Sequence, residues 1–170
     1  DLAAYDADSL WNYEVGLKSV WLDNRLVFNA TAYRIDWRDM QYSANSTNGA
    51  FAFITNLGQA RVYGLEADTV YAASPAWKGG LNLSLTDAVL TKDQATNGAI
   101  GLGTAGDRIP VIPRVSAGGW LEYRHELSGD LEFLTRADAS YVGVSHSAFD
   151  DDAAAANVKL GDFLLLSARA

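Results

Sequence analysis

The chain of 170 residues has the length of one structural unit, and its composition does not divide into parts of different character. Hydrophobic residues make up 49% of it, but mean hydropathy is only −0.04 and no apolar run approaches the roughly 18 residues of a membrane-spanning helix, which excludes a helical membrane protein. The net charge of −8 argues against a nucleic-acid binder, and the absence of cysteine excludes disulfides, thiolate metal sites and cysteine nucleophiles.

The first predicted strand starts at Trp11 and ends at Trp21, and its side chains alternate with a period of two. One face is apolar and carries Trp11, Tyr13, Val15, Leu17 and Trp21, with Ser19 among them. The other face carries Asn12, Glu14, Gly16, Lys18 and Val20. Asp23–Asn24 predicts a tight turn, because both residues tolerate the left-handed backbone of a hairpin. The chain then returns in a second alternating strand, which blurs beyond Arg34.

Five more strands follow in the same pattern. The third covers 51–71, with a bend or bulge near Asn56 to Gly58, and the fourth covers 80–90. The fifth covers 114–126, the sixth 131–141, and the seventh begins near Leu160. These strands are longer than the usual 3 to 10 residues of globular proteins.

The connections between the predicted strands alternate between short and long. Short turns are expected near residue 23, at 74–79 and at 127–129, whereas long loops are expected at 43–50, 92–113 and 146–159. Short turns at one end and long loops at the other are typical of outer-membrane barrels. Aromatic residues near strand ends on the apolar face, such as Trp21 and Tyr141, agree with the aromatic girdles of such barrels.

These patterns predict an all-β fold: an antiparallel up-and-down transmembrane β-barrel, present as an incomplete arc of about seven strands. Bacterial single-chain barrels use an even number of strands, so seven strands are expected to be part of a larger wall. The alternative is a soluble or secreted β-sandwich that serves as a binding or adhesion module. In that fold the apolar residues Leu17, Leu83, Leu121 and Phe133 would face a second sheet about 10 Å away.

Three segments resemble the barrels of TonB-dependent receptors, in the order in which that family carries them. They are SLWNYEVGLKSVWLDNRLVFNATAYRIDWRDMQ at 9–41, NLGQARVYGLEAD at 56–68 and GDRIPVIPR at 106–114. The resemblance implies a 22-stranded barrel around an N-terminal plug, of which residues 1–170 are a partial barrel domain without the plug and the remaining strands. We expect Glu14, Lys18 and Glu66 to face the lumen. Gly16 and Gly64 are expected to permit close approach or to relieve barrel curvature, and Pro110 and Pro113 to keep a loop out of the strand ladder.

The resemblance also implies a function for the parent protein. It would be a receptor and transporter in the outer membrane of a Gram-negative bacterium, taking up a scarce nutrient, with an iron-siderophore complex as the first expectation and vitamins or carbohydrates as others. Its partners would be outer-membrane lipid, the small-molecule ligand, and TonB acting through the plug region, with no nucleic acid. Energy coupling resides in the plug, so the isolated segment is expected to transport nothing.

No residue pattern in the chain predicts catalysis, so we expect no enzyme, no cofactor and no metal site; the ligand-binding residues stay undetermined. His125 is interpreted as a solvated strand-end residue. His146 with Asp150, Asp151 and Asp152 offers oxygen ligands for a cation, but a solvated acidic loop is the preferred interpretation. The glycine-rich segment 97–106 lacks the lysine and helix of a phosphate loop, which favours an extracellular loop.

Overall fold

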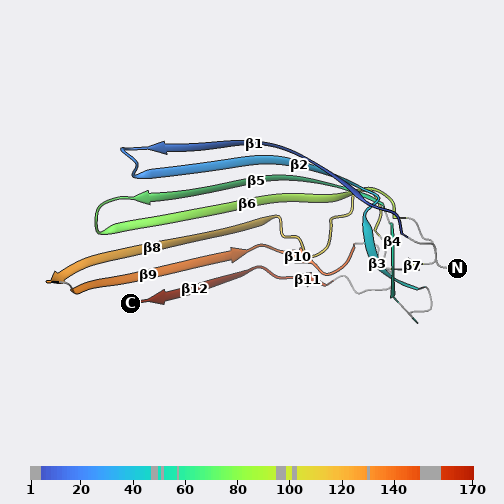
Figure 1. The fold of residues 1–170 in the computed structure, drawn as a ribbon. Coiled ribbons are helices and arrows are strands. Elements are labelled where there is room, and N and C mark those ends of the chain that lie inside the picture. Colours follow the sequence, from blue (N-terminus) through green and yellow to red (C-terminus); the bar gives the residue numbers. More distant parts are fainter. Residues whose placement is uncertain are drawn as a thin grey trace.

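The computed structural model describes residues 5–46, 50, 52–56, 58–94, 99–100, 103–129, 131–149 and 158–170. Within them the chain forms only strands, turns and irregular segments, and the seven longest strands make one antiparallel sheet (Figure 1). Each strand bonds to its neighbours in the order β1-β2-β5-β6-β8-β9-β12. In the described part of the chain there is no helix that is both long enough and apolar enough to cross a membrane.

The seven wall strands correspond to the seven strands that the alternation predicts. They are β1 (Ser9–Trp21), β2 (Leu26–Arg38), β5 (Gln59–Ala72), β6 (Trp77–Lys92), β8 (Val115–Ser128), β9 (Leu131–Val142) and β12 (Phe163–Arg169). The last of them begins at Phe163 rather than near Leu160, because Lys159 and Leu160 pair with another strand outside the wall.

The short turns all lie at one end of the wall, and their backbone fits the residues found there (Figure 1). Leu22, Asp23 and Asn24 have φ values of 56°, 54° and 66°, in the left-handed region that Asp and Asn tolerate best. Gly129 takes a φ of 58° in the turn between β8 and β9. The tight turns predicted near residue 23 and at 127–129 are confirmed.

The long connections at the opposite end contain small strands of their own (Figure 1). They are β3 (Gln41–Ser46), β4 (Ala52–Asn56), β7 (Ala99–Ile100), β10 (Ser145–His146) and β11 (Lys159–Leu160). They form a three-stranded sheet β4-β3-β7 and a separate pair β10-β11. The polar stretch at 43–50 is therefore only partly a loop, since hairpin pairing satisfies its backbone groups whatever the polarity of its side chains.

The third predicted strand, at 51–71, is divided. Its first part is β4, which leaves the wall to pair with β3, and its second part is β5. Gly58 lies between them with a φ of 70°, and the register between β5 and β6 shifts at Gln59/Ala60. The bend or bulge expected near Asn56 to Gly58 is confirmed, and it is sharp enough to end the strand.

The wall is a single layer, and its apolar side chains are not covered by a second sheet within the described residues. Leu17, Leu83, Leu121 and Phe133 are 54%, 38%, 50% and 42% exposed. In a sandwich these side chains would be buried in the core between two sheets. Their exposure therefore does not favour the sandwich alternative.

Candidate functional site

Residues paired across neighbouring strands point to the same side of a sheet, so the registers define two faces. The apolar face carries rows such as Val15, Ala32, Leu65, Leu85 and Val115. The polar face carries rows such as Lys18, Asn29, Asp68, Asn82 and Gly118. The sequence alternation thus becomes a physical division of the wall into two surfaces of different chemistry.

Aromatic rings of the apolar face gather near the short turns. The ring centroids of Trp77 and Tyr123 are 4.7 Å apart, and His125 stacks on Tyr123 at 6.2 Å. His125 is exposed close to the end of β8, as predicted from the sequence.

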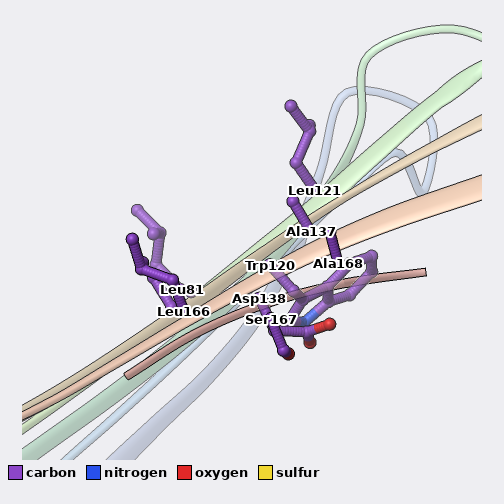
Figure 2. A pocket seen from close by; sticks show the side chains of 10 residues that line it. Leu81, Trp120, Leu121, Ala137, Asp138, Leu166, Ser167 and Ala168 are labelled. Atoms are coloured by element: carbon purple, nitrogen blue, oxygen red, sulfur yellow. The ribbon is translucent and has the colours of Figure 1, made fainter. Parts of the chain in front are cut away.

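Small residues hollow the apolar face between β6, β8, β9 and β12. The hollow measures about 620 Å³; its floor includes Gly119, Ala137 and Ala139, and Leu81, Leu121 and Leu166 line its sides. Figure 2 shows the two faces edge-on: Leu81, Leu121 and Leu166 lie on one side of the strands, and Trp120, Asp138 and Ser167 lie on the other.

On the polar face, charged and aromatic side chains form a cluster around Trp120. Arg136 donates to Asp138 from Nε at 2.9 Å and from Nη2 at 2.7 Å, and its guanidinium lies 4.4 Å from the centre of the Trp120 ring. The cluster borders a groove of about 520 Å³ that also involves Asn82 and Ser140. Charge pairing and the cation–π contact hold these side chains in fixed positions.

The predicted lumen-facing residues Glu14, Lys18 and Glu66 all lie on this polar face. Glu14 is opposite Tyr33, Lys18 is opposite Asn29, and Glu66 is opposite Thr31 and Ser84. They are spread over the wall and do not form one site. The alternation of β8 and β9 puts Trp120, Arg136 and Asp138 on the polar side of their strands, but only the register between the strands brings them together.

Two glycines of the polar face make room for aromatic rings. A Cβ on Gly64 would overlap the ring of Tyr33, and a Cβ on Gly80 would overlap the indole of Trp120. The predicted close approach at Gly64 is confirmed. At Gly16 the approach is milder, since the atom nearest to an added Cβ would be Thr31 Oγ1 at 3.3 Å.

The long connections pack together around a small buried core at their end of the wall. Met40, Ala60, Leu90 and Phe149 are at most 4% exposed, and Trp37 and Ile109 pack against them. These residues come from three different connections and from the adjoining ends of β2, β5 and β6. The connections are therefore anchored to the wall and to each other.

Backbone hydrogen bonds support the same packing. Val111 N donates to His146 O at 2.8 Å, which joins two connections, and Leu90 N donates to Asp107 O at 2.8 Å. Pro110 and Pro113 lie in the irregular segment just before β8, which agrees with their predicted role of keeping this loop out of the ladder. His146 pairs with Lys159 in β10-β11, whereas Asp150, Asp151 and Asp152 lie outside the described residues.

The residues that the structure describes contain no group of three or more histidine, aspartate or glutamate side chains that could hold a metal ion. The wall has one apolar face and one polar face, and the long connections pack together at one end of it.

Solved structures of outer-membrane receptors share this fold. The ferric yersiniabactin uptake receptor FyuA from Yersinia pestis matches with a TM-score of 0.73 and 21% identity, over 96% of this chain and 22% of that chain. The ferric-catecholate import receptor Fiu from Escherichia coli K12 matches with a TM-score of 0.65 and 22% identity, over 96% of this chain and 21% of that chain. The FrpB iron transporter from Neisseria meningitidis matches with a TM-score of 0.68 and 15% identity, over 96% of this chain and 24% of that chain.

The chain thus spans less than a quarter of the length of these proteins. The family described as TonB dependent receptor-like, beta-barrel matches residues 5–170, which is nearly the whole chain. This is a family of outer-membrane receptors and transporters of Gram-negative bacteria rather than of enzymes. The antiparallel wall, its two faces and this match together show that the chain belongs to the TonB-dependent receptor β-barrel family.

Proposed function

We propose that the protein containing this chain imports an iron-siderophore complex across the outer membrane of a Gram-negative bacterium. Residues 1–170 would form part of the barrel wall and three of its extracellular connections. The observation that carries this proposal is the single sheet with one exposed apolar face and one polar face, in a chain that the TonB-dependent receptor family matches from residue 5 to residue 170.

The two faces support a wall between lipid and an aqueous interior. Apolar side chains such as Leu17 and Leu121 would contact lipid, and the polar face would line the lumen, as in other transmembrane barrels. A wall with paired strands also satisfies its backbone groups, which hydrocarbon demands.

The cargo is proposed from the similar structures and from the packing of the long connections at one end of the wall. The names of FyuA, Fiu and FrpB refer to ferric yersiniabactin, ferric catecholates and iron. The buried core around Leu90 and Phe149 would hold the connections in place over the entrance, so that a ligand meets a preformed surface. Energy would come from TonB through the plug, which the family resemblance places outside residues 1–170.

Two measurements on cells test the proposal. The first is fractionation followed by protease digestion of intact cells. We expect the protein in the outer-membrane fraction, with the cuts that fall within residues 1–170 confined to 43–50, 92–113 and 146–159. Recovery in the soluble fraction would reject the barrel and favour the sandwich module.

The second measurement is uptake of radioactive iron supplied as a panel of ferric siderophores. We expect cells that carry the receptor to import at least one of them, and cells that lack either the receptor or TonB to lose that uptake. If vitamin or carbohydrate uptake depends on the receptor while iron uptake does not, the cargo assignment is wrong and the transporter assignment stands.

A further inference from the structure

The apolar face changes its chemistry abruptly toward the long connections. One row across the wall is wholly apolar and consists of Ala32, Leu65, Leu85 and Val115. Two residues further along the strands, Tyr63 lies between Arg34 and Asp87. In the next row, Arg61 lies between Asp36 and Val89. Val89 in turn forms an isolated antiparallel β-bridge with the backbone of Arg108. The side chains on this face of β2, β5 and β6 thus change from apolar to largely charged or polar at the same level of the wall.

We define the arginine patch as Arg34, Arg61, Arg108 and Arg114 together with the two aspartates among them. Asp36 Oδ2 lies 2.8 Å from Arg34 Nη2, and Asp36 Oδ1 lies 2.8 Å from Arg61 Nε. Asp87 Oδ1 lies 2.6 Å from Arg108 Nη1 and 3.6 Å from Arg114 Nη2. Four guanidinium groups against two carboxylates leave an excess of two positive charges.

The arginines keep hydrogen-bonding capacity beyond these pairs. A guanidinium carries five N–H donors, and each bridge to an aspartate engages only part of them. The side chains of Arg34 and Arg114 are 43% and 68% exposed, so a ligand at the surface can reach their guanidinium groups. The carboxylates therefore position the arginines without saturating them.

A hollow of about 490 Å³ borders the arginine patch on the side of the apolar row. Ala32, Leu65 and Leu85 line its apolar part, and Tyr63, Asp87 and Arg114 line its polar part. The Arg34 guanidinium lies 5.9 Å from the centre of the Tyr63 ring. An occupant of this hollow would meet hydrocarbon at one end and positive charge at the other.

We propose that the arginine patch and its hollow bind a phosphate-bearing lipid of the outer leaflet, with the phosphate at the arginines and an acyl chain in the hollow. Arginine pairs with phosphate through two parallel hydrogen bonds, and tyrosine is favoured at the level of lipid headgroups. The occupant is a membrane lipid rather than a soluble anion because the patch lies on the apolar face, away from the polar face along which a cargo would pass. The inference rests on the proposed barrel in the outer membrane, although not on the identity of the cargo.

The test uses the full-length receptor in uncharged detergent, with native mass spectrometry to count bound lipids. We expect phosphatidylglycerol to bind, phosphatidylcholine to bind much more weakly, and inorganic phosphate not to displace the lipid at equal concentration. The double variant Arg34→Gln/Arg108→Gln should bind phosphatidylglycerol about 30-fold more weakly, because each basic residue near an anionic lipid surface contributes about 1 kcal/mol and 1.4 kcal/mol corresponds to tenfold.

Two further variants make the outcome decisive. Arg124→Gln removes one positive charge from the polar face, where Arg124 Nε lies 2.8 Å from Glu132 Oε1, and should leave lipid binding unchanged. Arg34→Lys/Arg108→Lys keeps the charge and should restore most of the affinity if folding is intact. Equal lipid binding by the Gln double variant and the wild type would overturn the proposal, as would full displacement by inorganic phosphate. Iron uptake, measured separately, reports on the proposed cargo, so the two can fail independently.

Discussion

Gly80 shows how one missing side chain determines the arrangement of the polar face. Trp120 lies directly opposite Gly80 across the β6-β8 pair, and its indole occupies the space that a Cβ would need. The Arg136 guanidinium lies over the same ring, 4.4 Å from its centre, and donates to Asp138. The position of three large side chains thus depends on the absence of one methyl group.

We predict that Gly80→Ala lowers the free energy of unfolding of the receptor by about 1 to 3 kcal/mol, the usual cost of overpacking. Urea unfolding in detergent, followed by circular dichroism, measures the change. Gly161→Ala is the matched control, because nothing lies within 4 Å of the Cβ it would add. Since the clash is with the indole, Gly80→Ala should cost much less in a Trp120→Ala background, and an equal cost there would contradict the explanation.

Strand β6 offers a direct comparison of the two faces. Leu83 lies on the apolar face between Ala67 and Ala117, whereas Ser84 lies on the polar face between Glu66 and Ser116. The two positions are adjacent in the sequence and differ only in the side of the wall to which they point.

We predict that Leu83→Arg destabilises the folded receptor in lipid by about 2 to 4 kcal/mol, the cost of arginine on the lipid face of a barrel near the bilayer midplane. Ser84→Arg should cost far less, because Glu66 is its cross-strand neighbour. Folding into lipid vesicles from urea, followed by tryptophan fluorescence, compares the two variants. Similar costs at both positions would mean that the apolar face does not contact lipid.

The long strands could be predicted from the sequence because most of them alternate over about ten residues, and the turn residues Asp23, Asn24 and Gly129 mark strand ends. The small strands could not. β3 and β4 lie in a stretch that reads as a polar loop followed by the start of a wall strand, and two-residue strands such as β7 and β10 carry no periodicity. Which residues pair is decided by how the connections pack around Phe149 and Leu90.

The candidate sites were predictable only in part, for a related reason. Alternation assigns each residue to a face, as it did for Glu14 and Lys18, but it does not give the register between strands. The arginine patch joins residues from β2, β5, β6 and the segment before β8, so it exists only once those strands are aligned. The available signal was that Arg34 and Asp36 break the apolar row of their own strand.

Among the described residues, β1 and β12 are the outermost strands of the seven-stranded sheet, and each of them has one unpaired edge. Their neighbours in the sheet are β2 and β9 alone, and the apolar face beside them is exposed. Unpaired strand edges and large exposed apolar surfaces both promote association in water.

We therefore predict that residues 1–170, produced alone, aggregate in plain buffer and become dispersed only when detergent covers the apolar face. Light scattering after size-exclusion chromatography, with and without detergent, measures this. A monodisperse monomer in plain buffer that unfolds cooperatively would count heavily against a membrane wall.

The neighbour order of the sheet also has a consequence for the width of any closed barrel built from it. Every wall strand bonds to the wall strands that precede and follow it in the chain, so each hairpin is complete in itself. The diameter of a barrel grows with its number of strands. Duplication or loss of one internal hairpin would therefore widen or narrow a closed barrel of this kind by two strands, and only the strands that flank the change would take a new partner, so the width can change by copying or losing a short stretch of gene.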